Sequence, residues 1–262
     1  GPGYYELTVQ VRNKSDKSKV CLASETVSFG VVHLVNRTAE QARNDGYRFG
    51  LKVFEIGGPG VWWRRPLVWD LGKVVDASRQ VGLQWTRHKF NRGPSEKPGR
   101  VGTNELITKH SMNVVLKVES FPKEFFDTQR YGPMDEWVKN HGNQWSKCTV
   151  PQEQPYKKWL REQIKNIPRE QKVFEIWNEA WDKMSPEDFA RLCQYVVEVI
   201  LEERPDAIVG PNLGGHTSPY EFDARVIKAG GMKGMKMVAL HPYGLGRYQD
   251  RAWFRKYRQW LR

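Results

Sequence analysis

The chain has 262 residues, of which 39% are hydrophobic and 27% are charged, a composition typical of a globular protein with one large domain or two modest ones. No apolar run approaches the roughly 20 residues that a membrane-crossing helix needs, which excludes a transmembrane segment. The formal net charge of +12 admits nucleic acid, an anionic membrane surface or an acidic substrate as a partner.

Two further features of the composition bear on function. The three cysteines, Cys21, Cys148 and Cys193, are too few and too scattered for a disulfide framework or a zinc site, and we expect neither a metal nor a cofactor. Eleven tryptophans are unusual, and they indicate either a large core or flat apolar surfaces on which sugar rings or bases stack. Gly1 and Pro2 resemble the scar of a cleaved expression tag, so a missing signal peptide is not informative.

The first elements predicted along the chain are two β-strands. Apolar residues alternate with polar ones over 4–32, and a cluster of Lys, Ser and Asp interrupts them as a turn would. Because two strands cannot form a stable domain, we expect the hairpin of residues 1–35 to belong to a larger sheet or to be the remnant of one. Residues 36–47 are predicted to be a connector with a short helix.

From residue 48 onward, short apolar strands alternate with amphipathic helices. The predicted strands are 48–56, 82–90, 112–120, 172–179, 207–212 and 235–243, and the predicted helices are near 66–80, 103–110, 154–166, 185–204, 218–229 and 248–261. The helix that begins at Ser185 is the clearest, since Ser185 is a good N-cap and Pro186 suits the first helical position.

This alternation predicts a parallel sheet covered by helices. A doubly wound nucleotide-binding sheet would carry a Gly-rich turn that opens a helix, but "EIGGPG" (55–60) runs into "VWWRRP" without the G-x-G-x-x-G spacing. We therefore predict a (β/α)8-type TIM barrel over residues 48–262, apparently incomplete, with about six βα units.

Polar residues stand at the carboxyl ends of these strands, where TIM barrels carry their active sites. Each alone is compatible with a solvated charge or a structural histidine, but six that converge on one rim indicate a site. They are Glu55, Arg87 with His88, Lys117 with Glu119, Asn178 with Glu179, Asn212, and His241 with Tyr243.

Three of these motifs resemble the clan A retaining glycoside hydrolases, of the family 39-like or family 5-like kind. The motifs are "WNE" at the end of strand four, "TRHKF" on strand two and "HPY" on strand six, in the same order along the chain. The hairpin that ends in "SFGVV" also resembles the last strands of a β-sandwich that precedes the barrel in some such enzymes. The resemblance therefore implies that residues 1–35 are the end of an N-terminal β-sandwich-like region. The resemblance implies a carbohydrate substrate, and we expect a secreted or periplasmic location.

The resemblance also implies roles for individual residues. Glu179 matches the general acid/base, and Asn178 matches the residue that hydrogen-bonds the 2-hydroxyl of the sugar. Arg87 matches the arginine that supports the nucleophile, and His241 and Tyr243 match residues of the same subsite. Further candidates for substrate binding are His88 and the indoles of Trp63 and Trp181, with Trp62, Trp85 and Trp177 as alternatives.

The chemistry of retaining hydrolysis suits these residue types. It needs two carboxyl groups about 5–5.5 Å apart, one to protonate the leaving oxygen and one to attack the anomeric carbon. Burial beside Trp177 or Trp181 would raise the pKa of the acid, and a neighbouring arginine would keep the nucleophile ionised.

The nucleophile itself is missing from the pattern, because the resemblance places it at the end of a seventh strand. The sequence stops at Arg262, in the predicted sixth helix. We prefer the interpretation that the chain is a fragment; a second chain that completes the barrel, or a different closure with Glu119 or Glu55 as nucleophile, are the alternatives. We expect little or no hydrolase activity from this polypeptide alone.

Of two other kinds of function, one stays open and the other is disfavoured. The first is a carbohydrate-binding, catalytically incomplete barrel. The second is nucleic-acid binding by the basic C-terminal segment, but Trp253, Tyr257, Trp260 and Leu261 fall on one ordinary packing face, so we expect no nucleic-acid partner. Basic residues near the rim also suggest an anionic glycan as substrate: Lys52, Arg64, Arg65, Arg87, Lys89, Arg92 and Lys117.

Overall fold

The structure is a computed structural model, and it describes residues 3–12, 21–31, 50–51, 84–90, 103–213, 219–240 and 259. The predicted connector at 36–47 and the predicted helix at 66–80 lie outside these residues, as does nearly all of the one at 248–261. Within the described part of the chain, no helix combines the length and the apolar character needed to cross a membrane.

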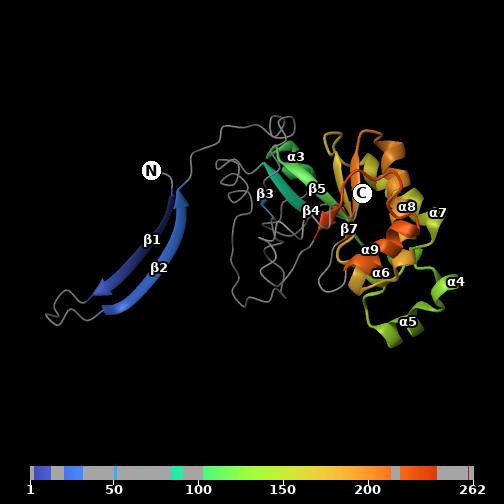
Figure 1. The fold of residues 1–262 in the computed structure, drawn as a ribbon, viewed down its shortest axis with the longest axis horizontal. Coiled ribbons are helices and arrows are strands. Elements are labelled where there is room, and N and C mark those ends of the chain that lie inside the picture. The colour runs from blue at the N-terminus through green and yellow to red at the C-terminus, as the bar shows by residue number, and fades with distance from the viewer. Residues whose placement is uncertain are drawn as a thin grey trace.

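The N-terminal hairpin is present. Strand β1 (Gly3–Arg12) pairs with β2 (Cys21–Val31) in antiparallel register, with an irregularity between Val11 and Arg12. These two strands form a sheet of their own, and in Figure 1 they stand apart from the rest of the described chain. That the hairpin is the end of a larger β-sandwich stays a proposal.

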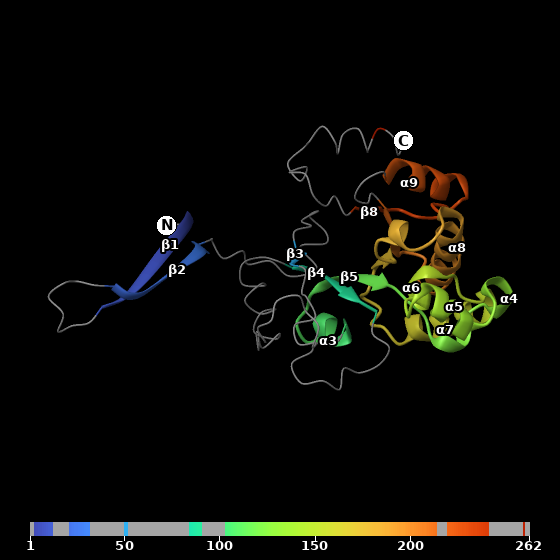
Figure 2. The same cartoon turned by 90° about the horizontal axis from the view of Figure 1, so that it is seen from below.

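The remaining strands form one parallel sheet that follows the order of the sequence, β3 to β8. The sheet curls into a half-barrel with helices between its strands, which confirms the predicted incomplete TIM-type fold (Figure 2). Its strands are β3 (Gly50–Leu51), β4 (Trp85–Lys89), β5 (Asn113–Val118), β6 (Val173–Ile176), β7 (Ile208–Leu213) and β8 (Ala239–Leu240).

Helices pack against one face of this sheet. They are α3 (Thr103–Thr108), α7 (Glu153–Lys165), α8 (Pro186–Glu203) and α9 (Pro219–Lys228), and α7 and α8 pack against each other (Figure 1). The Ser185 side chain caps α8 by accepting a hydrogen bond from the Asp188 amide, as the sequence predicts.

Alternation along the strands separates a core face from a polar face. One row across the sheet contains Leu116, Phe174 and Val209, which are fully buried in the hydrophobic core beneath the helices. The next row, on the opposite face, contains Lys117 and Glu175. The polar face is therefore the inner wall of the half-barrel, where TIM barrels place their functional groups.

A long excursion between β5 and α7 was not predicted. It contains the single-turn helix η1 (Lys123–Phe125), α4 (Thr128–Tyr131), α5 (Met134–His141) and α6 (Trp145–Cys148). Its turns rely on Gly132 and Gly142, whose φ angles are 74° and 77°, and its interior is aromatic. The Phe126 ring, for instance, lies edge-on to Trp137 and Trp145.

Candidate active site at the carboxyl end of strand β6

The main chain after β6 takes an unusual path. Trp177 and Glu179 both have left-handed backbone angles, with φ of 68° and 55°, whereas most non-glycine residues avoid this region. The Trp177 side chain is fully buried; its amide donates to the Val118 carbonyl (2.9 Å) and its indole nitrogen to the Lys147 carbonyl (3.2 Å). Packing around Trp177 thus holds the turn that presents Asn178 and Glu179.

Asn178 is held by an arginine from β4. The Arg87 guanidinium donates to both carboxylate oxygens of Glu175, at 2.5 and 2.6 Å, and to the side-chain oxygen of Asn178, at 2.9 Å. Glu175 is only 1% exposed, so this bidentate ion pair lies inside the half-barrel and reaches across β5. Arg87 therefore fixes the orientation of the Asn178 amide, because one guanidinium nitrogen serves both partners.

Glu175 was not singled out from the sequence. It follows Val173 and Phe174 and precedes Ile176 in an otherwise apolar strand. A charged residue within a buried strand is uncommon unless it is paired, and that was the available signal.

The main chain at Glu179 has supports of its own. The Glu179 amide donates to the side-chain oxygen of Asn212 on β7 (2.7 Å), while the Asn212 side-chain nitrogen donates to the Ala239 carbonyl on β8 (3.2 Å). The Lys183 ammonium donates to the carbonyls of Asn178 and Glu179, at 3.3 and 3.5 Å. Asn212 therefore links the fourth, fifth and sixth strands of the sheet at the level of Glu179.

A second charged group lies along β4 and β5. The Lys117 ammonium is 2.8 Å from the Glu119 carboxylate, and that of Lys89 is 3.8 Å from it. Burial raises the pKa of Glu119, but Lys117 and Lys89 outweigh burial and hold that pKa below its usual value. Burial lowers the pKa of Lys117, and Glu119 opposes this effect only in part. Glu119 is thus an ionised carboxylate near the inner wall.

Of the other residues predicted to bind substrate, His88 and Trp181 are described by the structure. His88 is 9% exposed and lies in the same row as Leu116 and Phe174, which faces the helices. Trp181 lies in the single-turn helix η2 (Ala180–Asp182), directly after Glu179. The predicted residues Trp63, His241 and Tyr243, together with Glu55, lie outside the described residues.

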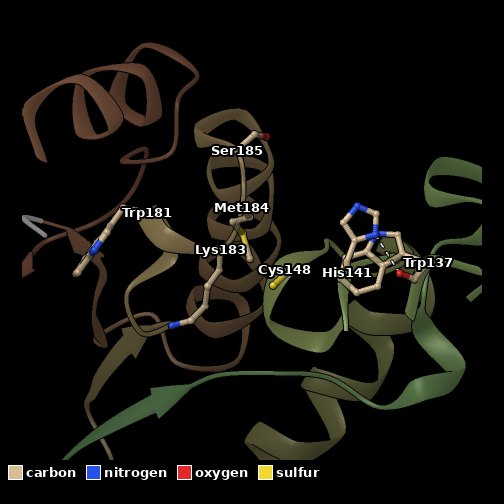
Figure 3. Close-up of a pocket in the computed structure, with 7 residues that line it drawn as sticks. All are labelled: Trp137, His141, Cys148, Trp181, Lys183, Met184 and Ser185. Atoms are coloured by element: carbon tan, nitrogen blue, oxygen red, sulfur yellow. Dashed lines mark hydrogen bonds between the residues drawn. The ribbon is translucent and has the colours of Figure 1, made fainter. Parts of the chain in front are cut away.

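A pocket of about 560 Å³ opens beside this site (Figure 3). It is lined by residues of α5, α6 and the segment that follows Glu179: Trp137, His141, Cys148, Trp181, Lys183, Met184 and Ser185. Within the described ranges, no three His, Cys, Asp or Glu side chains gather as metal ligands would.

Comparisons with known proteins support the fold. No protein-family model and no curated protein matches the chain. Among solved structures, it resembles a family 39 glycoside hydrolase from the gut symbiont Bacteroides cellulosilyticus WH2, with a TM-score of 0.54 and 15% identity over 92% of this chain and 46% of that one.

Two weaker likenesses are also to carbohydrate-active enzymes. One is to Bacteroides uniformis beta-glucuronidase 2, with a TM-score of 0.46 and 14% identity over 98% of this chain and 28% of that one. The other is to a family 51 alpha-L-arabinofuranosidase from Bifidobacterium longum, with a TM-score of 0.41 and 16% identity over 68% of this chain and 38% of that one. The chain thus spans less than half the length of the structures it resembles, and the likeness to the family 39 enzyme establishes a shared barrel fold.

Proposed function

We propose that the chain carries the acid/base half of a retaining glycoside hydrolase site, with an oligosaccharide or polysaccharide as substrate. The observation that supports this most is that Asn178 and Glu179 follow the carboxyl end of the fourth of the six described parallel strands, with the Asn178 amide held by Arg87. The likeness in fold to a family 39 glycoside hydrolase supports the same conclusion.

In the proposed reaction, Glu179 first protonates the glycosidic oxygen while a second carboxylate attacks the anomeric carbon from the other face. The resulting glycosyl-enzyme ester is then hydrolysed by a water molecule that Glu179 deprotonates. Asn178 hydrogen-bonds the 2-hydroxyl, a contact that strengthens in the transition state.

We propose that the nucleophile is a glutamate outside residues 1–262, supplied by a polypeptide that continues past Arg262 or by a second chain. The pairing of Arg87 with Glu175 gives Arg87 a partner other than the expected nucleophile, so its proposed role becomes the orientation of Asn178. Glu119 is the alternative nucleophile within the described residues, because Lys117 and Lys89 favour its ionised form.

The test uses Glu179→Gln in a polypeptide that extends past Arg262. Turnover of glycosides with poor leaving groups should fall by about 10²–10⁴-fold, since general acid catalysis is lost. Dinitrophenyl glycosides, whose leaving group needs no proton, should form the glycosyl-enzyme at nearly the normal rate, and burst kinetics would report this. Glu162→Gln, an exposed glutamate of α7, is the matched control.

Three results would contradict this proposal or a part of it. An equal loss in the rate of glycosyl-enzyme formation on both kinds of substrate would exclude Glu179 as the general acid. Full turnover by residues 1–262 alone would exclude an external nucleophile and would favour Glu119 or Glu55. Sugar binding without turnover in the extended protein would identify a binding protein instead.

The charges of the inner wall give little support to an anionic glycan as the substrate. Three of the basic residues suggested for it are described, and all of them face carboxylates: Arg87 pairs with Glu175, and Lys89 and Lys117 with Glu119. Comparing sulfated with neutral polysaccharides in one binding assay would test the preference, and equal affinities at low salt would remove it.

A further inference from the structure

The pocket of Figure 3 is separate from the polar inner wall but adjoins it. Trp181 and Lys183 follow Glu179 by two and four residues, and Lys183 both lines the pocket and donates to the Glu179 carbonyl. A ligand in the pocket would therefore contact side chains that follow the proposed acid closely in the chain, one of which is bonded to its main-chain carbonyl.

The walls of the pocket are aromatic. Figure 3 shows the Trp181 indole on one side of Lys183, Met184 and Cys148, and the Trp137 and His141 rings on the other. The rings of Trp137 and His141 are stacked, with centroids 4.6 Å apart and planes 18° apart. His141 is exposed and Trp137 half-buried, so this stacked pair remains partly accessible at the surface.

The contents of the pocket match the chemistry of sugars. A pyranose ring has an apolar face of C–H groups and an edge of hydroxyls, and the pocket combines indole faces with the polar groups of Lys183 and Ser185. Its volume of about 560 Å³ falls within the range of small-molecule sites, roughly 300–1,000 Å³.

We propose that this pocket is the subsite for the leaving-group side of an oligosaccharide substrate, with Trp137 and His141 as specificity-determining residues. The general acid acts on the oxygen of the leaving group, so that part of the substrate must lie next to Glu179. This inference rests on the proposed function, and it assigns a role to the excursion 121–152, which supplies Trp137, His141 and Cys148.

The experiment compares two substrates in the polypeptide that extends past Arg262. One is a monosaccharide glycosyl fluoride, whose single-atom leaving group leaves the pocket empty. The other is an oligosaccharide of three to six units with the same terminal sugar, taken from a panel of gluco-, galacto-, manno-, xylo- and arabino-configured chains. For Trp137→Ala, kcat/KM should fall about tenfold on the oligosaccharide and stay within about twofold on the glycosyl fluoride.

His141 provides a second variant in case Trp137→Ala destabilises the α5 packing. His141→Ala should weaken oligosaccharide turnover, His141→Phe should restore it by keeping a ring stacked on Trp137, and Asn140→Ala, an exposed neighbour on α5, should leave both substrates unaffected. Calorimetric titration of the same oligosaccharide into Glu179→Gln, with and without Trp137→Ala, reports binding independently of turnover.

The outcomes separate the two proposals. Equal effects on both substrates, or none, in folded Trp137 and His141 variants would overturn the subsite and leave the hydrolase assignment standing. Absence of turnover and of binding across the whole panel in the parent protein would overturn both.

Discussion

Glu179 is the residue on which the proposed chemistry depends, and its backbone is strained. A left-handed conformation costs an L-residue with a Cβ atom roughly 1–2 kcal/mol, whereas glycine adopts it freely. The amide of Glu179 is fixed in this conformation by Asn212, so the strain is retained.

This strain predicts an inverted order of stability at position 179. Both Glu179→Gly and Glu179→Ala remove the carboxylate, but the glycine variant should have a free energy of unfolding about 1 kcal/mol higher than the alanine variant. At Glu162 in α7 the order should reverse, since glycine destabilises a helix by about 1 kcal/mol relative to alanine. Urea denaturation of the four variants measures these free energies of unfolding. An alanine variant more stable than the glycine variant at both positions would contradict the prediction.

A second prediction concerns Glu175, which we expect to position the site through Arg87. In Glu175→Gln the guanidinium loses its charged partner and no longer fixes the Asn178 amide, so turnover in the extended polypeptide should fall by at least about tenfold. Because Asn178 is proposed to bind the 2-hydroxyl, the loss should be much smaller on a 2-deoxyglycoside.

The control for Glu175 is Glu170→Gln, which changes an exposed glutamate before β6. An identical loss on normal and 2-deoxy substrates would mean that Glu175 maintains the fold and does not act through Asn178.

At the scale of elements, Arg204 joins a helix to the sheet. Its guanidinium, in a residue only 5% exposed, donates to the carbonyls of Ile164, Ile167, Pro168 and Gln171, which end α7 and lead towards β6. The Ile164 and Pro168 carbonyls also accept main-chain amides, from Ile167 and Gln171, and Arg204 supplies further donors to the turn that follows α7.

Removal of this group should destabilise the fold. Arg204→Met would remove the guanidinium hydrogen bonds of four buried or partly buried carbonyls, and we expect the free energy of unfolding to fall by about 2–4 kcal/mol. Arg169→Met, an exposed arginine in the same turn, should change it by less than about 0.5 kcal/mol. Chemical denaturation measures the free energy of unfolding of both variants. If Arg204 did not stabilise the fold, both changes would be similarly small.

The regular elements could be predicted because local patterns specify them. The expected α8 begins at its Ser185 cap and the expected strands 112–120 and 172–179 contain β5 and β6, since apolar runs and cap residues are visible in the sequence. The excursion 121–152 was missed because its short helices are ordered by contacts among distant rings, such as Phe126 with Trp145, and no periodicity records these.

The site was predictable only in part for a similar reason. Strand ends indicated where Arg87, Asn178 and Glu179 would gather, but the choice of Glu175 as the partner of Arg87 depends on which side chains face each other across β5. The left-handed angles of Trp177 and Glu179 also left no local signal, because neither residue is glycine or asparagine.

Considered as a whole, the molecule is most strongly held at its centre. Among the described strands, β5 and β6 are paired on both sides and backed by α7 and α8, whereas the β1–β2 hairpin forms a sheet of its own. Isolated hairpins are at best marginally stable.

Hydrogen exchange should therefore follow a gradient from the centre outward. We expect the amides of Leu116, Phe174 and Ile176 to exchange slowest, at a rate near that of global unfolding, and those of β1 and β2 to exchange fastest among the strands. Mass spectrometry of peptic fragments resolves these segments; protection of the hairpin equal to that of β5 would show that it is anchored to the barrel.

The two left-handed residues that bracket Asn178 also matter for protein engineering. Their main-chain angles determine the direction in which the Asn178 and Glu179 side chains leave the backbone, whatever rotamer each side chain adopts. A designer who copied only these two side chains onto another parallel strand would transfer the functional groups without their direction. The smallest transferable unit includes the buried Trp177, with its hydrogen bonds to Val118 and Lys147, and the Asn212 amide that holds the turn from the next strand.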